Sequence, residues 1–320
     1  MLPNSLQYKP SKIESAILGV LCYFKLFDHP LKKAEIFCFS QEKVRAFAEF
    51  EAALTHLVEL GVIHLTGKYY FLEEEMEVFI DSREEAYCNA QKSLKLAQKI
   101  ARFIHCFPFV RAVFISGSLS KMSFPEGADF DFFIVTKTDR LWVSKMILAA
   151  FKRVFLFNSK RYFCINYFVD EEHLEIPDRN VFTATEICTL LPVVGKGVYS
   201  ELLKANSWVY DYFPNYKEKE WAVSDRSLFK RIGDFFEWPL SGKLGNKLDL
   251  YFMDVTYARW RKMYLDEMPS DQFDLAFRTT RGISKNHFKN YQFKVLKKYS
   301  DQVNKTEKVY QENYAKNISR

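Results

Sequence analysis

The chain has 320 residues with a formal net charge of +6, and 17% of its residues are aromatic, including 31 Phe. This length suggests two or three domains, because single hydrophobic cores seldom grow much past about 250 residues. The longest apolar runs, such as Ile17 to Phe24, are far shorter than the roughly 20 residues of a membrane-spanning helix. We therefore expect no membrane association.

The N-terminus and the cysteines predict a cytoplasmic protein. The first residues have neither a basic n-region nor an apolar h-region, so no export signal is expected. The six Cys lie far apart without a Cys-x-x-Cys motif, which is typical of reduced thiols rather than disulfides or zinc ligands. The six His likewise show no metal-ligand spacing.

Residues 1–74 are similar to a winged-helix module. Apolar spacing predicts helices over 11–27, 31–39 and 41–60, with Ser11 and Ser40 as N-caps and Gly61 ending the third helix. A hairpin is expected over 62–72, turning at Thr66-Gly67. Residues 75–108 then predict a connector helix that ends before Pro108.

Winged helices often bind DNA, but the charges of this module disfavour that role. A phosphate-binding surface requires clustered Lys and Arg. The third helix has only Lys43 and Arg45 as bases, and the acids in and after it are more numerous: Glu42, Glu49, Glu51, Glu59, Glu73, Glu74, Glu75 and Glu77. We expect this module to contact protein or to pack, and we do not expect it to bind DNA.

Residues 110–136 are the most informative stretch. Val110 to Ile115 predict a buried strand, and Ser116-Gly117-Ser118 predict a turn where the backbone can approach a ligand closely. With a short helical turn from Leu119, Ser118 and the first free amides would form an anion site. A second strand is expected to hold Asp129 to Val135.

The two aspartates of that second strand point to a metal. Side chains alternate along a strand, so Asp129 and Asp131 would share one face, about 7 Å apart along the chain. Mg²⁺ commonly takes one or two carboxylates together with substrate phosphates. Beside the Gly117-Ser118 turn, the pair outlines a nucleoside-triphosphate site. The alternative is that both aspartates form the polar face of an edge strand.

This stretch resembles the DNA-polymerase-β-like nucleotidyltransferase superfamily. The signature of that superfamily is an apolar strand, Gly-Ser or Gly-Gly, about ten residues, and Asp-apolar-Asp-apolar, here Ile115 to Ser118 followed by Asp129 to Phe132. The resemblance implies that Asp129 and Asp131 bind catalytic Mg²⁺ or Mn²⁺. It also implies a set of nucleotide-binding candidates: Gly117, Ser118, Lys121, Asn166, Arg278 and Arg281.

Families of this kind usually place a third carboxylate on a later strand. The predicted strand 161–169 has Asn166 at its centre, and an Asn can coordinate a metal but cannot act as a base. We expect Asp170, at the end of that strand, to be the third catalytic carboxylate. One alternative is that Glu175, on a short strand over 174–176, fills this role. The other alternative is that the site is catalytically weakened.

Around these strands, helices are expected over 140–155 and 186–191, and residues 192–197 should break the chain. The helix start at Thr185-Glu186 is interpreted as structural, with a cleft-facing role as the alternative. Residues 109–197 would thus form the nucleotidyltransferase core. Residues 199–215 predict a helix and an aromatic turn, and their arrangement is similar to bacterial nucleotidyltransferase-domain proteins, a resemblance that implies no substrate.

Residues 198–320 predict a helical C-terminal domain with a basic tail. Residues 278–320 hold 11 Lys or Arg against three acids. This tail is interpreted either as a solvated basic helix, as a triphosphate contact through Arg278, Arg281 or Lys285, or as an attractor for a polyanionic acceptor such as RNA.

The sequence therefore predicts an α+β protein with a small mixed β-sheet core flanked by helices. The expected activity is a metal-dependent nucleotidyltransferase that moves an NMP from an NTP to a protein, RNA or small-molecule acceptor. The alternatives are a degenerate nucleotide-binding scaffold or sensor, and a winged-helix nucleic-acid-binding protein.

Overall fold

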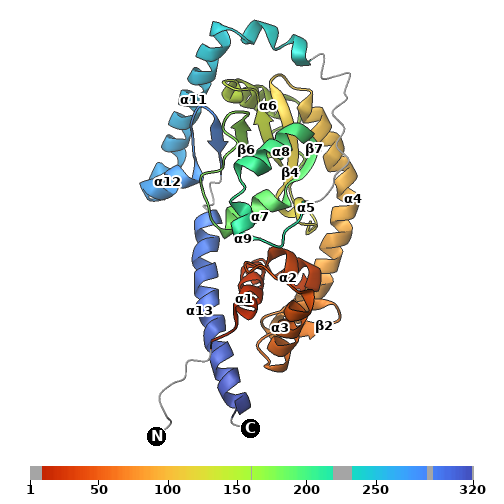
Figure 1. Cartoon of the computed structure of the whole chain (residues 1–320). Helices are drawn as coiled ribbons and strands as arrows, with labels where there is room; N and C mark the ends of the chain where they lie inside the picture. Colours follow the sequence, from red (N-terminus) through yellow and green to blue (C-terminus); the bar gives the residue numbers. More distant parts are fainter. Residues whose placement is uncertain (1–8, 160, 219–232, 287–290, 319–320) are drawn as a thin grey trace.

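The computed structural model describes residues 9–159, 161–218, 233–286 and 291–318, except for the side chain of Asn166. It shows an α+β chain in which the long helix α4 (Phe79–His105) connects an N-terminal module, residues 12–71, to a helix-flanked central sheet (Figure 1). The expected α+β class is confirmed. In the described part of the chain, no helix combines the length and apolarity needed to cross a bilayer.

The N-terminal module contains three helices and a three-stranded sheet. Ser11 caps its first helix, because its side chain accepts from the Glu14 amide while Glu14 accepts from the Ser11 amide. The sheet order is β1-β3-β2, and Gly67 makes the expected hairpin turn. The elements are α1 (Lys12–Lys25), β1 (Leu31–Lys32), α2 (Lys33–Phe39), α3 (Phe47–Glu59), β2 (His64–Thr66) and β3 (Tyr69–Phe71).

The predicted start of the third helix is wrong. Helix α3 begins at Phe47, and Ser40 donates instead to the carbonyl of Ile36 at 2.9 Å. Residues 41–46 are held by a distant side chain. Asn215 donates to the carbonyl of Glu42 at 2.8 Å and accepts from the amide of Val44 at 3.1 Å. Tertiary bonds thus replace the expected helical ones.

The central sheet has five strands in the order β7-β4-β5-β6-β8. Strands β5 and β6 are parallel and the other neighbours are antiparallel, so the sheet is mixed as expected. Its elements are β4 (Val110–Ser116), α5 (Gly117–Ser120), β5 (Asp131–Thr136), α6 (Leu141–Phe155), β6 (Cys164–Asp170), α7 (Val181–Thr189), β7 (Leu191–Val194) and β8 (Ile283–Lys285).

Three strand assignments from the sequence are wrong. The expected break at 192–197 begins inside β7, an edge strand that tolerates Pro192 because only one side of it is paired. The expected helical C-terminal domain contributes β8 to the sheet. Residues 174–176 form no strand.

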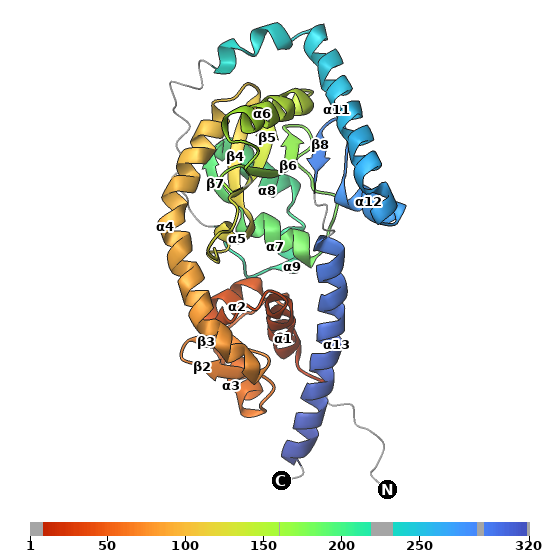
Figure 2. The same cartoon turned by 180° about the vertical axis from the view of Figure 1, so that it is seen from behind.

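Helices cover both faces of the sheet (Figures 1 and 2). We call the face under α7 and α8 (Lys196–Ala205) the front face, and the face under α4 and α6 the back face. Phe133 and Val135 join the front core, which is continuous with that of the N-terminal module. Phe132 and Ile134 join the back core. Strand β5 therefore alternates between two cores, with its polar end at Asp131.

The remaining elements lie after α8. The short helix α9 is followed, after the undescribed residues 219–232, by helices that run along the back core and by a final helix that packs on α1. These elements are α9 (Val209–Tyr212), α11 (Lys243–Tyr264), α12 (Ser270–Ala276), α13 (Tyr291–Ile318), and the 3-10 turns η1 (Glu74–Val78), η2 (Trp238–Leu240) and η3 (Leu265–Glu267). The start of the helical pattern expected from residue 225, and residues 287–290 of the tail, lie outside the described residues. None of the six cysteines, all of which lie in the described part of the chain, forms a disulfide.

Candidate functional site

Three segments meet at one end of the central sheet, which we call the Asp131 end. Ser116, the last residue of β4, pairs with Asp131, the first residue of β5. Asp131 pairs in turn with Cys164, the first residue of β6. Because Asp131 lies two residues before Phe133, its side chain points to the front face, toward α7.

The sequence placed Asp129 on the second strand. In the structure it lies in the loop before β5. Phe130 and Phe132 both join the back core, which matches the expectation that they point away from the aspartates. Asp129 is half-buried, and its charge acts on Asp131. The structure thus brings the two aspartates together, with one held by the sheet and the other by the loop.

Gly117 makes the close approach that the sequence predicts. Its φ is +67°, a region that favours glycine. A Cβ atom at this position would overlap the carboxylate of Asp131. The missing side chain therefore lets the Asp131 carboxylate pack directly against the backbone of the turn.

The carboxyl of Asp131 lies in an unusual electrostatic environment. Its pKa is raised to about 6, mainly by burial and also by the charges of Asp129 and Glu186, while a hydrogen bond with Cys164 and the charge of Lys121 act in the opposite direction. A carboxyl with such a pKa is still mostly ionised at neutral pH. The surrounding negative charge would be relieved by an added cation.

Lys121 and Glu186 form the other half of the site. The Lys121 ammonium lies 2.9 Å from the Glu186 carboxylate and donates to the carbonyl of Gly117 at 3.1 Å. Glu186 is on α7, so the structure favours the cleft-facing interpretation that the sequence had ranked second. The signal in the sequence was Glu186, the one charged residue of α7.

Ser118 follows Gly117 on the same turn and is half-exposed. Helix α5 is a single turn of four residues, so the expected anion site gains little from a helix dipole. The carbonyl of Ser118 accepts from the amides of Lys121 and Ser123 at 3.1 and 3.0 Å. These bonds close the turn and fix Lys121 beside it.

The carboxylates at the Asp131 end fit a Mg²⁺ or Mn²⁺ ion that is also bound by phosphate. Among the described residues, no group of three or more His, Cys, Asp or Glu is arranged to hold a metal ion. Mg²⁺ usually needs only one or two carboxylates when the substrate phosphates supply further oxygens. Asp129 and Asp131 would be those ligands, since the charge crowding at Asp131 favours a cation.

Asp170 is not part of this site, contrary to the sequence-based expectation. In the parallel pairing, Cys164 lies opposite Asp131, and Asp170 lies opposite Thr136 at the other end of β5. Five residue steps along a strand separate the two ends by roughly 17 Å. Asp170 also belongs to the back face, because Phe168, two residues earlier, is in the back core.

Asp170 has structural partners instead. Its carboxylate is fully buried and accepts from the amide of Glu172 at 3.1 Å and from Nδ1 of His173 at 2.6 Å. The alternative third acid, Glu175, is exposed and pairs with Arg179 at 2.7 Å. Asp170 therefore cannot act beside Asp131, and the carboxylate of Glu175 is engaged by Arg179.

The structure does not bring the other nucleotide-binding candidates to the Asp131 end. Arg281 pairs with Asp139 at 2.6 Å, and the Asp139 amide faces Asp170. Arg278 pairs with Asp178 at 2.7 Å, and Lys285 contacts the same carboxylate from β8, the strand beyond β6. Asn166 lies in β6, but its side chain is outside the described part of the chain.

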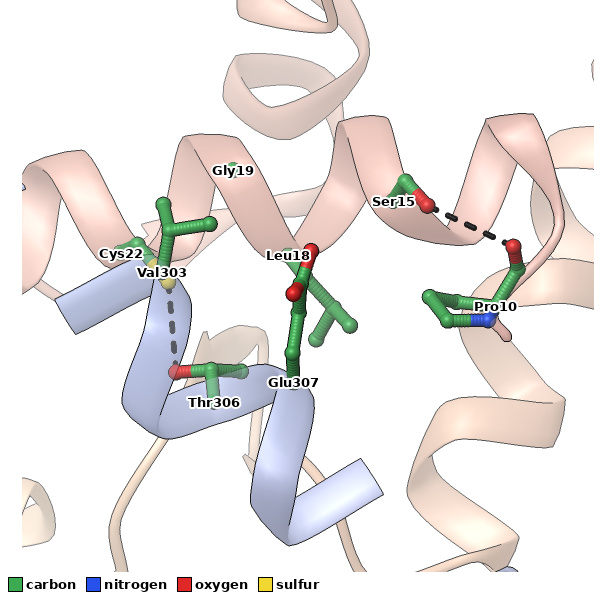
Figure 3. Close-up of a pocket in the computed structure, with 8 residues that line it drawn as sticks. All are labelled: Pro10, Ser15, Leu18, Gly19, Cys22, Val303, Thr306 and Glu307. Atoms are coloured by element: carbon green, nitrogen blue, oxygen red, sulfur yellow. Dashed lines mark hydrogen bonds between the residues drawn. The ribbon is translucent and has the colours of Figure 1, made fainter. Parts of the chain in front are cut away.

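Two small pockets between helices of the described residues lie away from the Asp131 end. One of about 30 Å³ lies between α1 and α13, where Cys22 contacts Thr306 at 3.3 Å (Figure 3). Roughly one water molecule would fill it. Another, of about 10 Å³, lies between α1 and α7 and is lined in part by Tyr23 and Thr185. Neither pocket is large enough for a nucleotide.

Comparison of the chain with family models, curated proteins and solved structures finds no match. The residues of the Asp131 end and their sequence signature are therefore the basis for inferring a function.

Proposed function

We propose that the protein is a metal-dependent nucleotidyltransferase that moves an NMP from an NTP to an acceptor. One observation carries this proposal, the packing of the Asp131 carboxylate against the Gly117 turn, where only glycine fits. This contact joins the two halves of the signature, the Gly-Ser turn and the Asp-x-Asp pair, in one place.

Different residues of the Asp131 end would bind the metal ion and the triphosphate. Asp129 and Asp131 hold the Mg²⁺ or Mn²⁺, which when bound would neutralise charge on the phosphates and on the leaving oxygens. The Gly117 backbone and Ser118 contact the triphosphate, and Lys121 is placed to contact it from the end of the turn. Such catalysis depends mostly on positioning and charge neutralisation, so no strongly nucleophilic side chain is required.

Glu186 replaces Asp170 as the third acid of the proposal. It comes from the helix above the front face and faces the same turn as the two aspartates. In the described structure its carboxylate is neutralised by Lys121. When Lys121 contacts phosphate, Glu186 becomes free to accept a proton from an acceptor hydroxyl.

The experiment is a thermal-shift titration with each common NTP, with Mg²⁺ or with a chelator. Wild type should be stabilised only by nucleotide with metal, because ligands that bind the folded state raise its stability. Asp129→Asn and Asp131→Asn should lose this shift, whereas Glu186→Gln, which removes only the proposed proton acceptor, should keep it. Glu175→Gln, which removes an exposed carboxylate elsewhere, should keep it. If no NTP shifts wild type, the proposal is wrong.

A second function is favoured by one observation. The position on β6 opposite Asp131 is Cys164, where a strand-borne third carboxylate could otherwise stand. A protein with this arrangement could bind nucleotide as a scaffold or sensor without turnover. Pyrophosphate release during incubation with NTP and cell extract would support the transferase, and tight metal-dependent binding without any release would support the scaffold.

We do not extend the proposal to DNA binding by the N-terminal module. Helix α3 itself contains Glu49, Glu51 and Glu59 and no Lys or Arg, so its exposed side is acidic. The acidic side of such a helix would repel DNA phosphates.

A further inference from the structure

The N-terminal module lies directly beside the Asp131 end. Both views show α1 and α2 next to α5 and α7, with the module filling the space below this end of the sheet (Figures 1 and 2). The front core continues from α7 into α1 without a break. The module and the candidate site therefore share a boundary, and the contacts across it determine how they influence each other.

Helix α4 holds the segment that closes the Gly117 turn. Arg83 donates through Nη1 to the carbonyl of Met122 at 3.0 Å, and the amide of Phe124 donates to the carbonyl of Ala86 at 3.1 Å. Met122 has a φ of +52°, which is unfavourable for a residue with a side chain. It immediately follows Lys121, so the bond from Arg83 restrains the end of the turn that carries Lys121.

Arg83 also binds the N-terminal module. Its Nη2 lies 3.0 Å from the carboxylate of Glu35 on α2, and its side chain is only 1% exposed. A buried guanidinium is stable only when its charge is paired. Glu35 supplies that charge, so the contact between Arg83 and Met122 depends on a residue of the module.

His29, in the loop after α1, completes this corner. It is buried, and its pKa is lowered to about 3 by burial and by the neighbouring charges of Arg83, Lys121 and Lys32. The imidazole is therefore neutral, and it packs in the corner without adding charge beside the cations of the turn. The charges of both Lys121 and Arg83 therefore act on this residue of the module.

We propose that Arg83 is a positioning residue for the Gly117–Met122 turn, and that the N-terminal module, through Glu35, is a working part of the nucleotide site. This inference rests on the proposed function for its consequence, which is nucleotide affinity. Its structural statement, that Arg83 and Glu35 hold the turn, can be tested without any nucleotide.

The test measures amide hydrogen exchange in peptides covering residues 117–124 of the full-length protein, together with the affinity for metal and NTP. In Arg83→Met, exchange in this segment should become about tenfold faster, since it reports local opening, and nucleotide affinity should fall about tenfold or more. Peptides from the middle of β4 and β5 should be unchanged. Arg83→Lys keeps the charge but not the two-pronged geometry, so it should lie between wild type and Arg83→Met.

Glu35→Gln tests the dependence on the module. It should change exchange and affinity in the same direction as Arg83→Met, by about threefold, because the guanidinium then keeps only a neutral partner. Glu51→Gln is the matched control. It breaks the exposed pair between Glu51 and Lys33 in the same module, and both quantities should stay as in wild type.

Unchanged exchange at 117–124 in folded Arg83→Lys and Glu35→Gln would overturn the inference, even if Arg83→Met fails to fold. Equal acceleration in all peptides would also overturn it, because that would indicate a general loss of stability. If exchange changes as expected but wild type binds no NTP, the positioning role stands and the proposed function fails.

Discussion

Each end of the central sheet contains an aspartate, and the surroundings of the two aspartates differ. At one end Asp131 is crowded by Asp129 and Glu186, and its pKa is raised to about 6. At the other end Asp170 is fully buried, and its carboxylate is bonded to the amide of Glu172 and to His173. A carboxylate whose hydrogen bonds are all supplied by the protein serves the fold. One that is left with excess negative charge is suited to bind a cation.

The largest expected effect concerns Asp170. Asp170→Ala removes a buried carboxylate and leaves the Glu172 amide and His173 without their acceptor, which should lower the free energy of unfolding by about 3 kcal/mol. Urea denaturation would measure this loss. Nucleotide binding by the folded fraction should be unchanged. A selective loss of nucleotide binding without a loss of stability would mean that Asp170 belongs to the nucleotide site and is not a purely structural residue.

Gly117→Ala should be next in size. Positive φ costs about 1 kcal/mol for alanine, and overlap with the Asp131 carboxylate adds a further cost of about 1–2 kcal/mol. Gly127→Ala is the matched control, because Gly127 has a φ of +78° and no atom near its missing Cβ. The difference in unfolding free energy between the two variants isolates the contact with Asp131. Equal losses would mean that this contact is loose.

The smallest effect has the opposite sign. Asp131 has a pKa of about 6 in the folded protein against an ordinary value of 3.8, so the folded state binds its proton more tightly than the unfolded state. Stability from this residue is therefore present below about pH 4 and is lost as the pH rises to about 6.

Asp131→Asn should remove that loss. At about 1.4 kcal/mol per pKa unit, the gain in the free energy of unfolding is at most about 3 kcal/mol. Because the Asp131 side chain is only partly buried, solvent screening should reduce this gain to about 1–2 kcal/mol at pH 7.5. Urea denaturation at pH 4 and pH 7.5 would show the gain only at the higher pH. A less stable variant at pH 7.5 would indicate that Asp131 is a structural residue like Asp170.

Local signals predicted those parts of the fold that local bonds determine. The Ser11 cap of α1, the Gly67 hairpin and the strand before Gly117 all depend on neighbours within a few residues. The start of α3 could not be predicted, since Asn215 holds residues 41–46 from far along the chain. Strand β8 was missed for a similar reason, because its partner β6 lies more than a hundred residues earlier.

The candidate site was predictable where the signature is contiguous. Gly117, Asp129 and Asp131 are brought together as expected. The error at Asp170 arose from register. Residues at matching ends of parallel strands lie together, so the partner of the first residue of β5 had to be sought at the start of β6. Glu186 comes from a helix, and no spacing rule relates a helix to a strand that it covers.

Strand β8 also has a consequence for synthesis on the ribosome. Because Ile283–Lys285 pair with β6, the central sheet is finished only after most of the chain has been made. Until then the outer edge of β6 presents unpaired amides and carbonyls, which invite pairing with other chains. A fragment ending after β7 would retain this open edge permanently. All residues of the Asp131 end are thus synthesised well before β8 covers the outer edge of β6.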